Sequence, residues 1–410
     1  MSEPWRSFGL RSLPASSART QLTALSPMVG AMFADARREL ARPLIGITSD
    51  GAVQPGLFSL SPTGVPTDAI TDAALAFLEL LTAEQRQRAV FPLDAEERRT
   101  WFNIHPNVMR HGLLLEDLDG RQRAAALAIM AATLSARGHA QARDIMRVNG
   151  LLVEITNRAD DFGEWPYFLS FFGEPSSDQP WAWQLDGHHL NVNATVIGDH
   201  LLIAPTLMGS EPCRVDTGPL AGTALFAIEQ HAGMALMRAL DSTQFAQAQR
   251  CASILPGEIP PELSHPIDGR MVAGAFKDNA IVAPEGLRGD ALRDGQRRLL
   301  RDLIGTYVGW QRDGHAALKM AEIDRHLDET YLTWMGVVDD DGPFYYRVQS
   351  PVVLIEFDHH PGIVFDNLEP SPNHIHTVIR TPNGGDYGLD LLRQHHERFD
   401  HTTGGHEPRR

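Results

Sequence analysis

The sequence is short of cysteine, of long apolar runs and of positive charge. Its two cysteines, Cys213 and Cys251, cannot form a disulfide framework and fit reduced thiols in the cytoplasm. No apolar run has the length of a membrane span. Acidic residues number 52 against 36 basic ones, and the net charge of −16 argues against nucleic acid or an anionic membrane as a partner. A small-molecule substrate is expected instead, and a homo-oligomer stays open.

The motifs of several common enzyme classes are also missing. The chain has no Walker phosphate loop, no Gly-x-Ser-x-Gly elbow and no Cys-x-x-Cys pair. No internal repeat is evident either. Because hydrophobic residues make up 43% and charged residues 21% of the chain, the composition is that of an ordinary globular protein. Its chemistry must therefore be sought in individual residues.

Histidine is frequent, with 18 residues, and the most informative stretch is residues 351–390. Residues 352–357 are apolar and rich in β-branched side chains, which predicts a strand that leads into Glu356 and Asp358. A second alternating run covers residues 374–380. Alternate residues of a strand share a face, so pairing of the two runs would bring two imidazoles, two carboxylates and a guanidinium together.

This combination is typical of a divalent metal site. His374 and His376 are two residues apart on one predicted strand and could both reach one ion. Either Glu356 or Asp358 would be the carboxylate, as a ligand or as a general base. The alternative is a polar face that is merely exposed to solvent. We expect a metal, with zinc first and iron or copper also compatible with these ligands.

A second pair of histidines lies within residues 181–196, whose alternation predicts one strand before a turn at 198–199 and a second strand at 201–204. His189, Asn191 and Asn193 would share one face of the first strand, and His188 the other. We expect His189 to be the third imidazole ligand and the asparagines to orient the metal or the substrate. A bulge at Gly187 would turn His188 inward instead, and an exposed polar face remains the alternative.

Further residues are candidates for catalysis or substrate binding. Glu211, held between glycine and proline residues, could be a ligand or a general base. Two arginines would bind a substrate carboxylate or stabilise an oxyanion. Three aromatic residues would line a pocket, although each taken singly also suits an ordinary core position. These five residues are Arg347, Arg380, Trp181, Trp183 and Tyr345.

Five segments together resemble the bacterial and fungal family catalogued as domain of unknown function 3500. The resemblance extends over most of the chain, from about residue 101 to 395. It implies one family-wide domain and links the two histidine stretches, but it supplies no reaction. The segments are Trp181-x-Trp183-x-Leu185-x-Gly187-His188-His189-Leu190, Gly209-x-Glu211-Pro212, Tyr346-Arg347 with Ile355-Glu356-Phe357-Asp358, His374-x-His376-Thr377-Val378-x-Arg380, and Asp386-Tyr387-Gly388.

The order of predicted elements favours an α+β fold, a mostly antiparallel sheet flanked by helices in a single compact body. Residues 1–66 are expected to be loop-rich, with a helix at 27–40. Residues 67–400 are expected to form one domain, and residues 401–410 a flexible tail. Within the domain we expect a helical layer at 67–158, sheet segments at 165–205 and 343–381, and helices at 222–335. Individual helices are predicted at 68–81, 119–137 with Gly138 as its C-cap, 140–158, 225–240, 242–254, 291–311, 315–334 and 389–398.

The resulting functional hypothesis is a metal-dependent hydrolase. A metal with three protein ligands lowers the pKa of bound water to about 7 and makes hydroxide available for attack on a small carboxylate-bearing ester, lactone or amide. The same side chains would also serve an iron or copper oxidoreductase. Two further hypotheses are a non-catalytic site for a metal or a small acid, and a metal-free polar network with acid–base roles.

Overall fold

A computed structural model describes residues 27–103, 111–159, 161–265, 267–365, 367–400 and 407–408. Its centre is a 12-stranded sheet in the order β1-β3-β4-β5-β6-β14-β13-β12-β11-β10, with β2 beside β3 and β9 beside β11. In the described part, the pairs β1·β3 and β9·β11 are parallel and the others antiparallel. The predicted α+β class with a mostly antiparallel sheet is confirmed.

The strands of this sheet have the following bounds: β1 Val90–Phe91, β2 Leu113–Leu114, β3 Tyr167–Phe172, β4 Trp181–Gly187, β5 Leu190–Ile197, β6 His200–Ser210, β9 Gln249–Cys251, β10 Leu287–Arg288, β11 Tyr331–Gly336, β12 Phe344–Gln349, β13 Leu354–Pro361 and β14 Pro370–Arg380. The helices are α2 Pro27–Leu40, α3 Asp68–Glu79, α4 Ala83–Ala89, α5 Gly120–Thr133, α6 Ala136–Thr156, α7 Ala227–Arg238, α8 Ser242–Ala248, α9 Asp294–Val308, α10 Asp313–Asp324 and α11 Leu389–Arg398. Two short hairpins lie outside the sheet: β7 Arg214–Val215 with β8 Thr223–Ala224, and β15 Phe399–Asp400 with β16 Glu407–Pro408.

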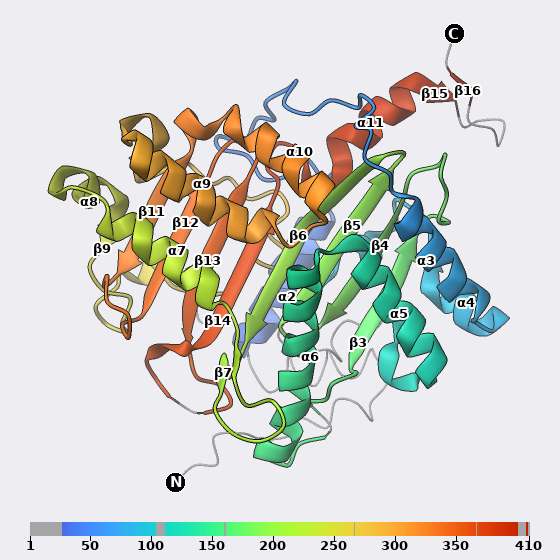
Figure 1. Ribbon diagram of the computed structural model, residues 1–410, viewed down its shortest axis with the longest axis horizontal. Coiled ribbons are helices and arrows are strands. Elements are labelled where there is room, and N and C mark those ends of the chain that lie inside the picture. The colour runs from blue at the N-terminus through green and yellow to red at the C-terminus, as the bar shows by residue number, and fades with distance from the viewer. Residues whose placement is uncertain are drawn as a thin grey trace.

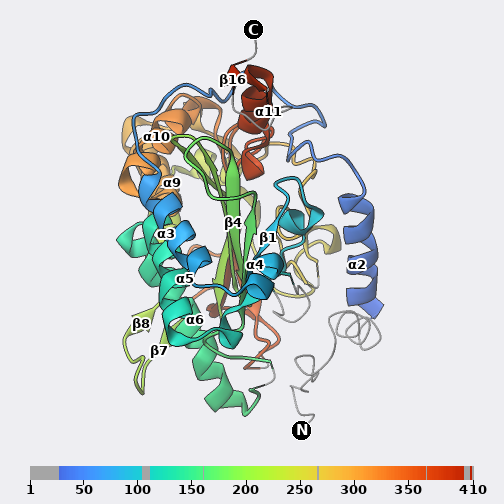
Figure 2. The same ribbon diagram turned by 90° about the vertical axis from the view of Figure 1, so that its right-hand side faces the viewer.

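The two faces of the sheet are covered differently (Figure 2). Helices α3, α5, α6, α9 and α10 lie on one face, where the largest hydrophobic core is found. Helix α2 and irregular segments lie on the other, over a smaller core. This smaller core includes Phe33 of α2, Trp101, Phe276 and Val378 of β14. The second face is the one that carries the candidate site.

The order of elements occurs twice along the chain. The run α3-α4-β1-β2-α5-α6-β3-β4-β5-β6 is followed by α7-α8-β9-β10-α9-α10-β11-β12-β13-β14. Strands β3, β4, β5 and β6 follow one another from one side of the sheet, as β11, β12, β13 and β14 do from the other. β6 lies beside β14 at the centre (Figure 1). The two halves are therefore related by an approximate twofold axis through the middle of the sheet.

Equivalent side chains support this duplication. Gln122 at the start of α5 donates to the carbonyl of Leu80 and to the side chain of Gln85. In the second half, Gln296 of α9 donates in the same way to Ala239 and Gln244. The expectation of no internal repeat is therefore wrong. The repeat is not evident in the sequence because the matching positions are widely spaced and the intervening residues differ between the halves.

Several predicted boundaries need correction. The strand expected at 181–196 is two strands, β4 and β5, joined by a turn at His188 and His189. The helix expected at 119–137 ends at Thr133, and Gly138 lies inside α6, where a Cβ would come within 2.3 Å of the carbonyl oxygen of Trp310. The helices expected at 242–254 and 315–334 end at 248 and 324; β9 begins directly after the first, and β11 includes the last residues expected for the second.

Candidate metal centre

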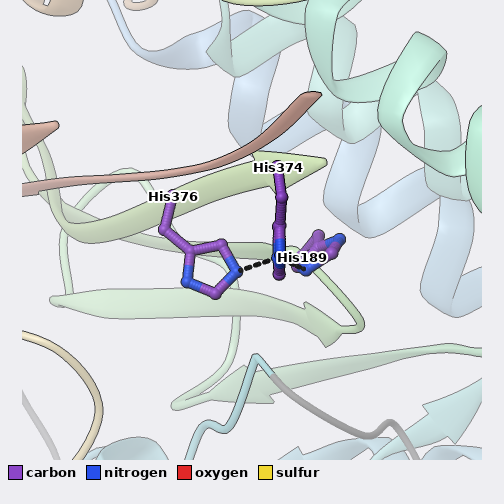
Figure 3. Close-up of side chains that lie close together, drawn as sticks. All are labelled: His189, His374 and His376. Atoms are coloured by element: carbon purple, nitrogen blue, oxygen red, sulfur yellow. Dashed lines mark hydrogen bonds between the residues drawn. The ribbon is translucent and has the colours of Figure 1, made fainter. Parts of the chain in front are cut away.

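Three imidazoles from two parts of the chain meet at one end of the central strands (Figure 3). The Nε2 atom of His374 lies 3.3 Å from Nε2 of His189 and 3.1 Å from Nε2 of His376. One potential ligand atom from each ring lies within 4.8 Å of the others, and all three residues are buried. We call these residues the histidine triad.

The backbone places His189 in the triad through a turn and not through strand alternation. His189 has φ +61°, in the left-handed region. Its N–H donates to the carbonyl of Asn103, and its own carbonyl accepts from the N–H of Gly209, each over 2.8 Å. Because both backbone groups of His189 are paired, the ring is held over the end of β6.

Gly209 makes room for two of the three rings. It lies opposite His376 in the β6·β14 ladder. A Cβ at this position would stand 2.8 Å from Cδ2 of His376 and 3.4 Å from Cδ2 of His189. Any side chain here would therefore push at least one imidazole out of place.

The hydrogen bonding of His374 fixes its tautomer. Nδ1 lies 2.6 Å from the carbonyl oxygen of Pro361, which can only accept, so Nδ1 carries the proton. The Nε2 lone pair then points at His189 and His376. An Nδ1–H bonded to a backbone carbonyl is a frequent partner of a metal-binding histidine, because it orients the ring and raises its basicity.

Burial keeps the triad uncharged. It lowers the pKa of all three histidines well below the usual value, and the neighbouring imidazoles lower the pKa further. At neutral pH the triad therefore presents lone pairs rather than positive charge. Such a set of neutral nitrogens can accept a cation.

The other predicted metal ligand, His188, lies in the same turn but makes different contacts. Its Nδ1 lies 2.7 Å from Oδ1 of Asn149 on α6, and its ring packs beside Phe162 and on the ring of His189. The ring of His188 therefore stacks on the ring of His189 and helps to fix its orientation. The question of which of the two histidines joins the cluster is settled geometrically in favour of His189.

The two carboxylates of β13 lie on the expected face but are occupied by other partners. Glu356 accepts from the N–H groups of Val272 and Ala273, each over 2.8 Å, and from the hydroxyl of Tyr345 over 2.6 Å. Burial raises the pKa of Glu356, and these donors oppose that rise. With its oxygens bonded to these groups, Glu356 is a structural anchor for the segment around residue 272.

Asp358 is paired with a buried arginine. It accepts from the N–H of Arg270 over 2.9 Å and from Nε of Arg270 over 2.7 Å. Nε2 of His360 lies 3.1 Å from Oδ2 of Asp358, the oxygen that also accepts from the backbone N–H of Arg270. Burial alone would raise the pKa of Asp358, but Arg270 and His360 bring it down to about 2. Asp358 is thus an anion beside the triad.

His360 is the neighbour of the triad that the sequence interpretation missed. Its ring centroid lies 4.0 Å from that of His376 and 5.3 Å from that of His374. A signal was present, because strand alternation from Glu356 and Asp358 places His360 on the same face. Arg270 carried no such signal, since it lies in an irregular segment far along the chain.

Glu211 holds a loop next to His374. Its carboxylate accepts from three successive N–H groups, those of Ile363, Val364 and Phe365, at 2.8 to 3.1 Å. It also lies 3.6 Å from Nδ1 of His374. Burial raises its pKa, and the three N–H groups oppose that rise. Because Glu211 faces Nδ1 and not Nε2, it supports His374 rather than completing the set of Nε2 atoms.

The two predicted arginines do not reach the triad. Arg380 is enclosed by Asp386 and Asp278, with 2.7 Å between the paired atoms of each ion pair. Burial opposes the charge of Arg380, but these aspartates raise its pKa. Arg347 pairs with Glu285 over 3.2 Å. Arg380 is therefore committed to partners within the chain, whereas the buried Nε of Arg347 has no hydrogen-bond partner among the described residues.

The remaining predicted binding residues are packed against or bonded to other groups. Trp181 and Trp183 belong to the core on the helix-covered face of the sheet. Asn193 is bonded to the carbonyl of Pro205 and to Gln184, and Asn191 donates to Asp186. The prediction of a single strand over 181–196 placed His189 and these asparagines on one strand; in the structure His189 lies in the turn at 188–189, and the asparagines lie on β5, which follows it.

The arrangement can hold a metal ion in a set of three nitrogen donors.

In the described part of the chain, no helix has both the length and the apolar character needed to cross a bilayer. No curated protein and no solved structure matches the chain. A family model described as "Protein of unknown function (DUF3500)" matches residues 63–389, which include the triad and both structural halves. The chain belongs to this family.

Proposed function

We propose that the protein is a metal-dependent enzyme whose divalent ion is bound by Nε2 of His189, His374 and His376. The observation that carries the proposal is the convergence of these atoms, with separations of 3.1 and 3.3 Å. Zinc–nitrogen bonds of about 2.0–2.1 Å in tetrahedral geometry require nitrogens roughly 3.3 Å apart. Neutral imidazoles this close repel through their lone pairs unless a proton or a cation lies between them.

The reaction class that fits best is hydrolysis by a metal-bound water. Three imidazoles leave a fourth position for water, whose pKa such a site lowers to about 7. The resulting hydroxide would attack the carbonyl of a small ester, lactone or amide. His360, oriented by Asp358, is the group beside the triad that could carry a proton. Because Arg347 and Arg380 each form ion pairs with other residues of the chain, we do not assign them a substrate carboxylate. The two free thiols are consistent with a cytoplasmic enzyme.

A second candidate is copper-dependent oxidoreduction, which the all-nitrogen donor set favours. Imidazole suits copper as well as zinc. A site of two histidines and one carboxylate, as in many iron oxygenases, is less compatible with the geometry, because Glu356 and Asp358 are bonded to other groups and Glu211 faces the Nδ1 side of His374. Zinc hydrolysis and copper redox chemistry are therefore the two alternatives.

The discriminating experiment loads untagged protein with zinc or with copper. The zinc form is assayed on nitrophenyl esters and lactones, and the copper form for oxygen consumption with phenolic reductants. Turnover in one form that is lost in His374→Ala, but kept in the control His231→Ala at an exposed position of α7, supports the corresponding reaction. Tight metal binding without turnover in either assay would favour a non-catalytic metal site.

A further inference from the structure

The ring of His189 is held in a different way from the ring of His374. Nδ1 of His374 is bonded to the carbonyl of Pro361, but no described residue forms a hydrogen bond with Nδ1 of His189. The turn fixes the backbone of His189, whereas rotation of an imidazole about its Cβ–Cγ bond is soft and has broad minima. Because Nε2 lies off this axis, such a rotation would carry it away from His374 (Figure 3). Packing must therefore hold the plane of this ring.

The ring of His188 provides this packing. It is stacked on the ring of His189, with 3.9 Å between the ring centroids and 24° between the ring planes. Phe162 is a further neighbour of His188, at a centroid distance of 5.5 Å. Rotation of His189 about its Cβ–Cγ bond would break the stacked contact, so the contact restricts that rotation.

Helix α6 in turn fixes the ring of His188. Oδ1 of Asn149 lies 2.7 Å from Nδ1 of His188, and Nδ2 of Asn149 donates to the carbonyl of Gly163 over 2.6 Å. Since the bond to Gly163 identifies Nδ2 as the donor, Oδ1 is the acceptor and Nδ1 of His188 carries the proton. The hydroxyl of Tyr167 donates to the carbonyl of His188 over 3.1 Å and holds its backbone. Asn149 and His188 are only 3% and 8% exposed, so these bonds form away from bulk water.

The duplicated fold places this arrangement in the half that supplies the turn histidine of the triad. The sequence Gly-His-Ala occurs at residues 138–140 of α6 and at 314–316 of α10, the equivalent helix. Counting along both helices from this motif, the equivalent of Asn149 is Arg325, which is exposed. The turn that corresponds to the two histidines is formed by residues 350–353, which include no histidine. The amide, the stacked ring and the ligand therefore occur together in one half and are replaced together in the other.

We propose that Asn149 and His188 are positioning residues that preorganise the metal centre. Asn149 fixes the tautomer and the plane of His188, and the stacked ring of His188 keeps Nε2 of His189 directed at Nε2 of His374. This inference rests on the proposed binding of a metal by the triad, because it concerns the orientation of one ligand. It gives control over metal affinity to α6, a helix in which the sequence indicated no functional residue.

The zinc affinity of full-length variants, measured by competition with a chromophoric chelator, tests the proposal. We expect His188→Ala and Asn149→Leu to bind zinc about tenfold or more weakly, as is usual when groups that orient metal ligands are removed. His188→Phe keeps a ring for stacking and should bind zinc within about threefold of the wild type. The control His315→Ala removes a buried histidine of α10 and should leave the affinity unchanged.

The copper form gives a readout that a loss of stability alone does not move. Reorientation of His189 changes the d–d absorption band and the electron paramagnetic resonance spectrum, whereas a less stable protein with an intact site keeps the wild-type spectra. We expect changed spectra in His188→Ala and wild-type spectra in His188→Phe. Wild-type spectra and wild-type zinc affinity in both His188→Ala and Asn149→Leu would overturn the inference and leave the metal proposal standing.

Nuclear magnetic resonance of the metal-free protein tests the inference independently of metal binding. With isotopically labelled histidine, His188 should be found as the Nδ1–H tautomer, and Asn149→Leu should remove this preference. The stacked ring should shift the ring protons of His189 upfield, and His188→Ala should abolish that shift. An Nε2–H tautomer of His188, or unchanged His189 signals in His188→Ala, would overturn the inference. Failure of the metal proposal is seen separately, as a wild-type protein that binds neither zinc nor copper.

Discussion

His189 and His374 belong to opposite halves of a duplicated fold, and their Nε2 atoms lie 3.3 Å apart. The β4–β5 turn of the first half supplies His189, and the final strand of the second half supplies His374 and His376. The positions related by the approximate twofold axis do not carry the same residues: β12 and β13 are joined by residues 350–353, Ser-Pro-Val-Val, where β4 and β5 are joined by the two histidines. The candidate site thus arises where the two halves differ.

Gly209→Ala should weaken metal binding without unfolding the protein. The added Cβ would stand 2.8 Å from Cδ2 of His376 and 2.8 Å from the carbonyl oxygen of Ile375. We expect metal affinity to fall by about tenfold or more, the size of effect seen when the surroundings of metal ligands are disturbed. Competition with a chromophoric chelator measures this. Gly305→Ala in α9, where a Cβ meets nothing within 4 Å, is the control and should leave affinity unchanged.

Arg380→Ala should destabilise the fold. Its guanidinium is fully buried between Asp278 and Asp386; without it Asp386 would lose its ion-pair partner in the core, while Asp278 would keep only Arg99, over 3.2 Å. We expect the free energy of unfolding to fall by about 3–5 kcal/mol in chemical denaturation. Arg393→Ala, which breaks two exposed ion pairs on α11, should cost less than about 1 kcal/mol. Full stability of Arg380→Ala combined with loss of turnover would instead restore the substrate-binding role expected from the sequence.

Glu211→Gln should loosen the loop next to His374. A neutral amide offers one acceptor oxygen in place of a carboxylate that accepts from three N–H groups. We expect a loss of about 1–3 kcal/mol in stability and faster hydrogen exchange at Ile363, Val364 and Phe365. Glu369→Gln, at an exposed position of the same connection, is the control. Unchanged exchange at these three amides in Glu211→Gln would contradict the anchoring role.

The fold should lose stability as the pH falls below about 6.5. His359 is buried between Phe344 and Phe357, and burial lowers its pKa from 6.5 to about 3. Between these values the unfolded chain binds a proton that the folded chain does not, so stability is full above pH 6.5 and declines towards pH 3. Each such histidine contributes a slope of about 1.4 kcal/mol per pH unit.

The variant His359→Asn isolates this contribution. Asparagine can retain an acceptor for the N–H of Phe344, which donates to Nδ1 of His359 over 3.0 Å, but it does not titrate. Denaturation between pH 6.5 and 5, where carboxylates contribute little, should give a slope lower by about one proton than in the wild type. An equal slope in both proteins would show that His359 is not neutral in the folded state.

The sequence was informative where periodicity governs the structure. Alternation in residues 352–358 and 374–380 correctly predicted that β13 and β14 pair and that Asp358 and His376 share a face. The helix predicted at 68–81 is present as α3, Asp68–Glu79. Local rules of strand and helix chemistry were sufficient for these elements.

Long-range contacts accounted for what could not be predicted. A two-residue turn at His188 and His189 is hidden inside an alternating run, because alternation continues on both sides of it. One partner each of Glu356, Asp358 and Arg380 lies 84 to 102 residues earlier in the chain, in an irregular segment without periodicity. Residue types alone therefore suggested catalytic roles for side chains that form ion pairs and anchors.

Elemental analysis shows whether the histidine triad binds a metal ion. Protein purified without an affinity tag at neutral pH, together with the variant His374→Ala/His376→Ala, would be examined by elemental analysis as isolated and after reconstitution with zinc and with copper. We expect about one equivalent of metal per chain in the wild type and loss of that metal in the variant, with both proteins folded. A wild-type protein that binds no metal after reconstitution, or a variant that retains the same metal, would contradict it.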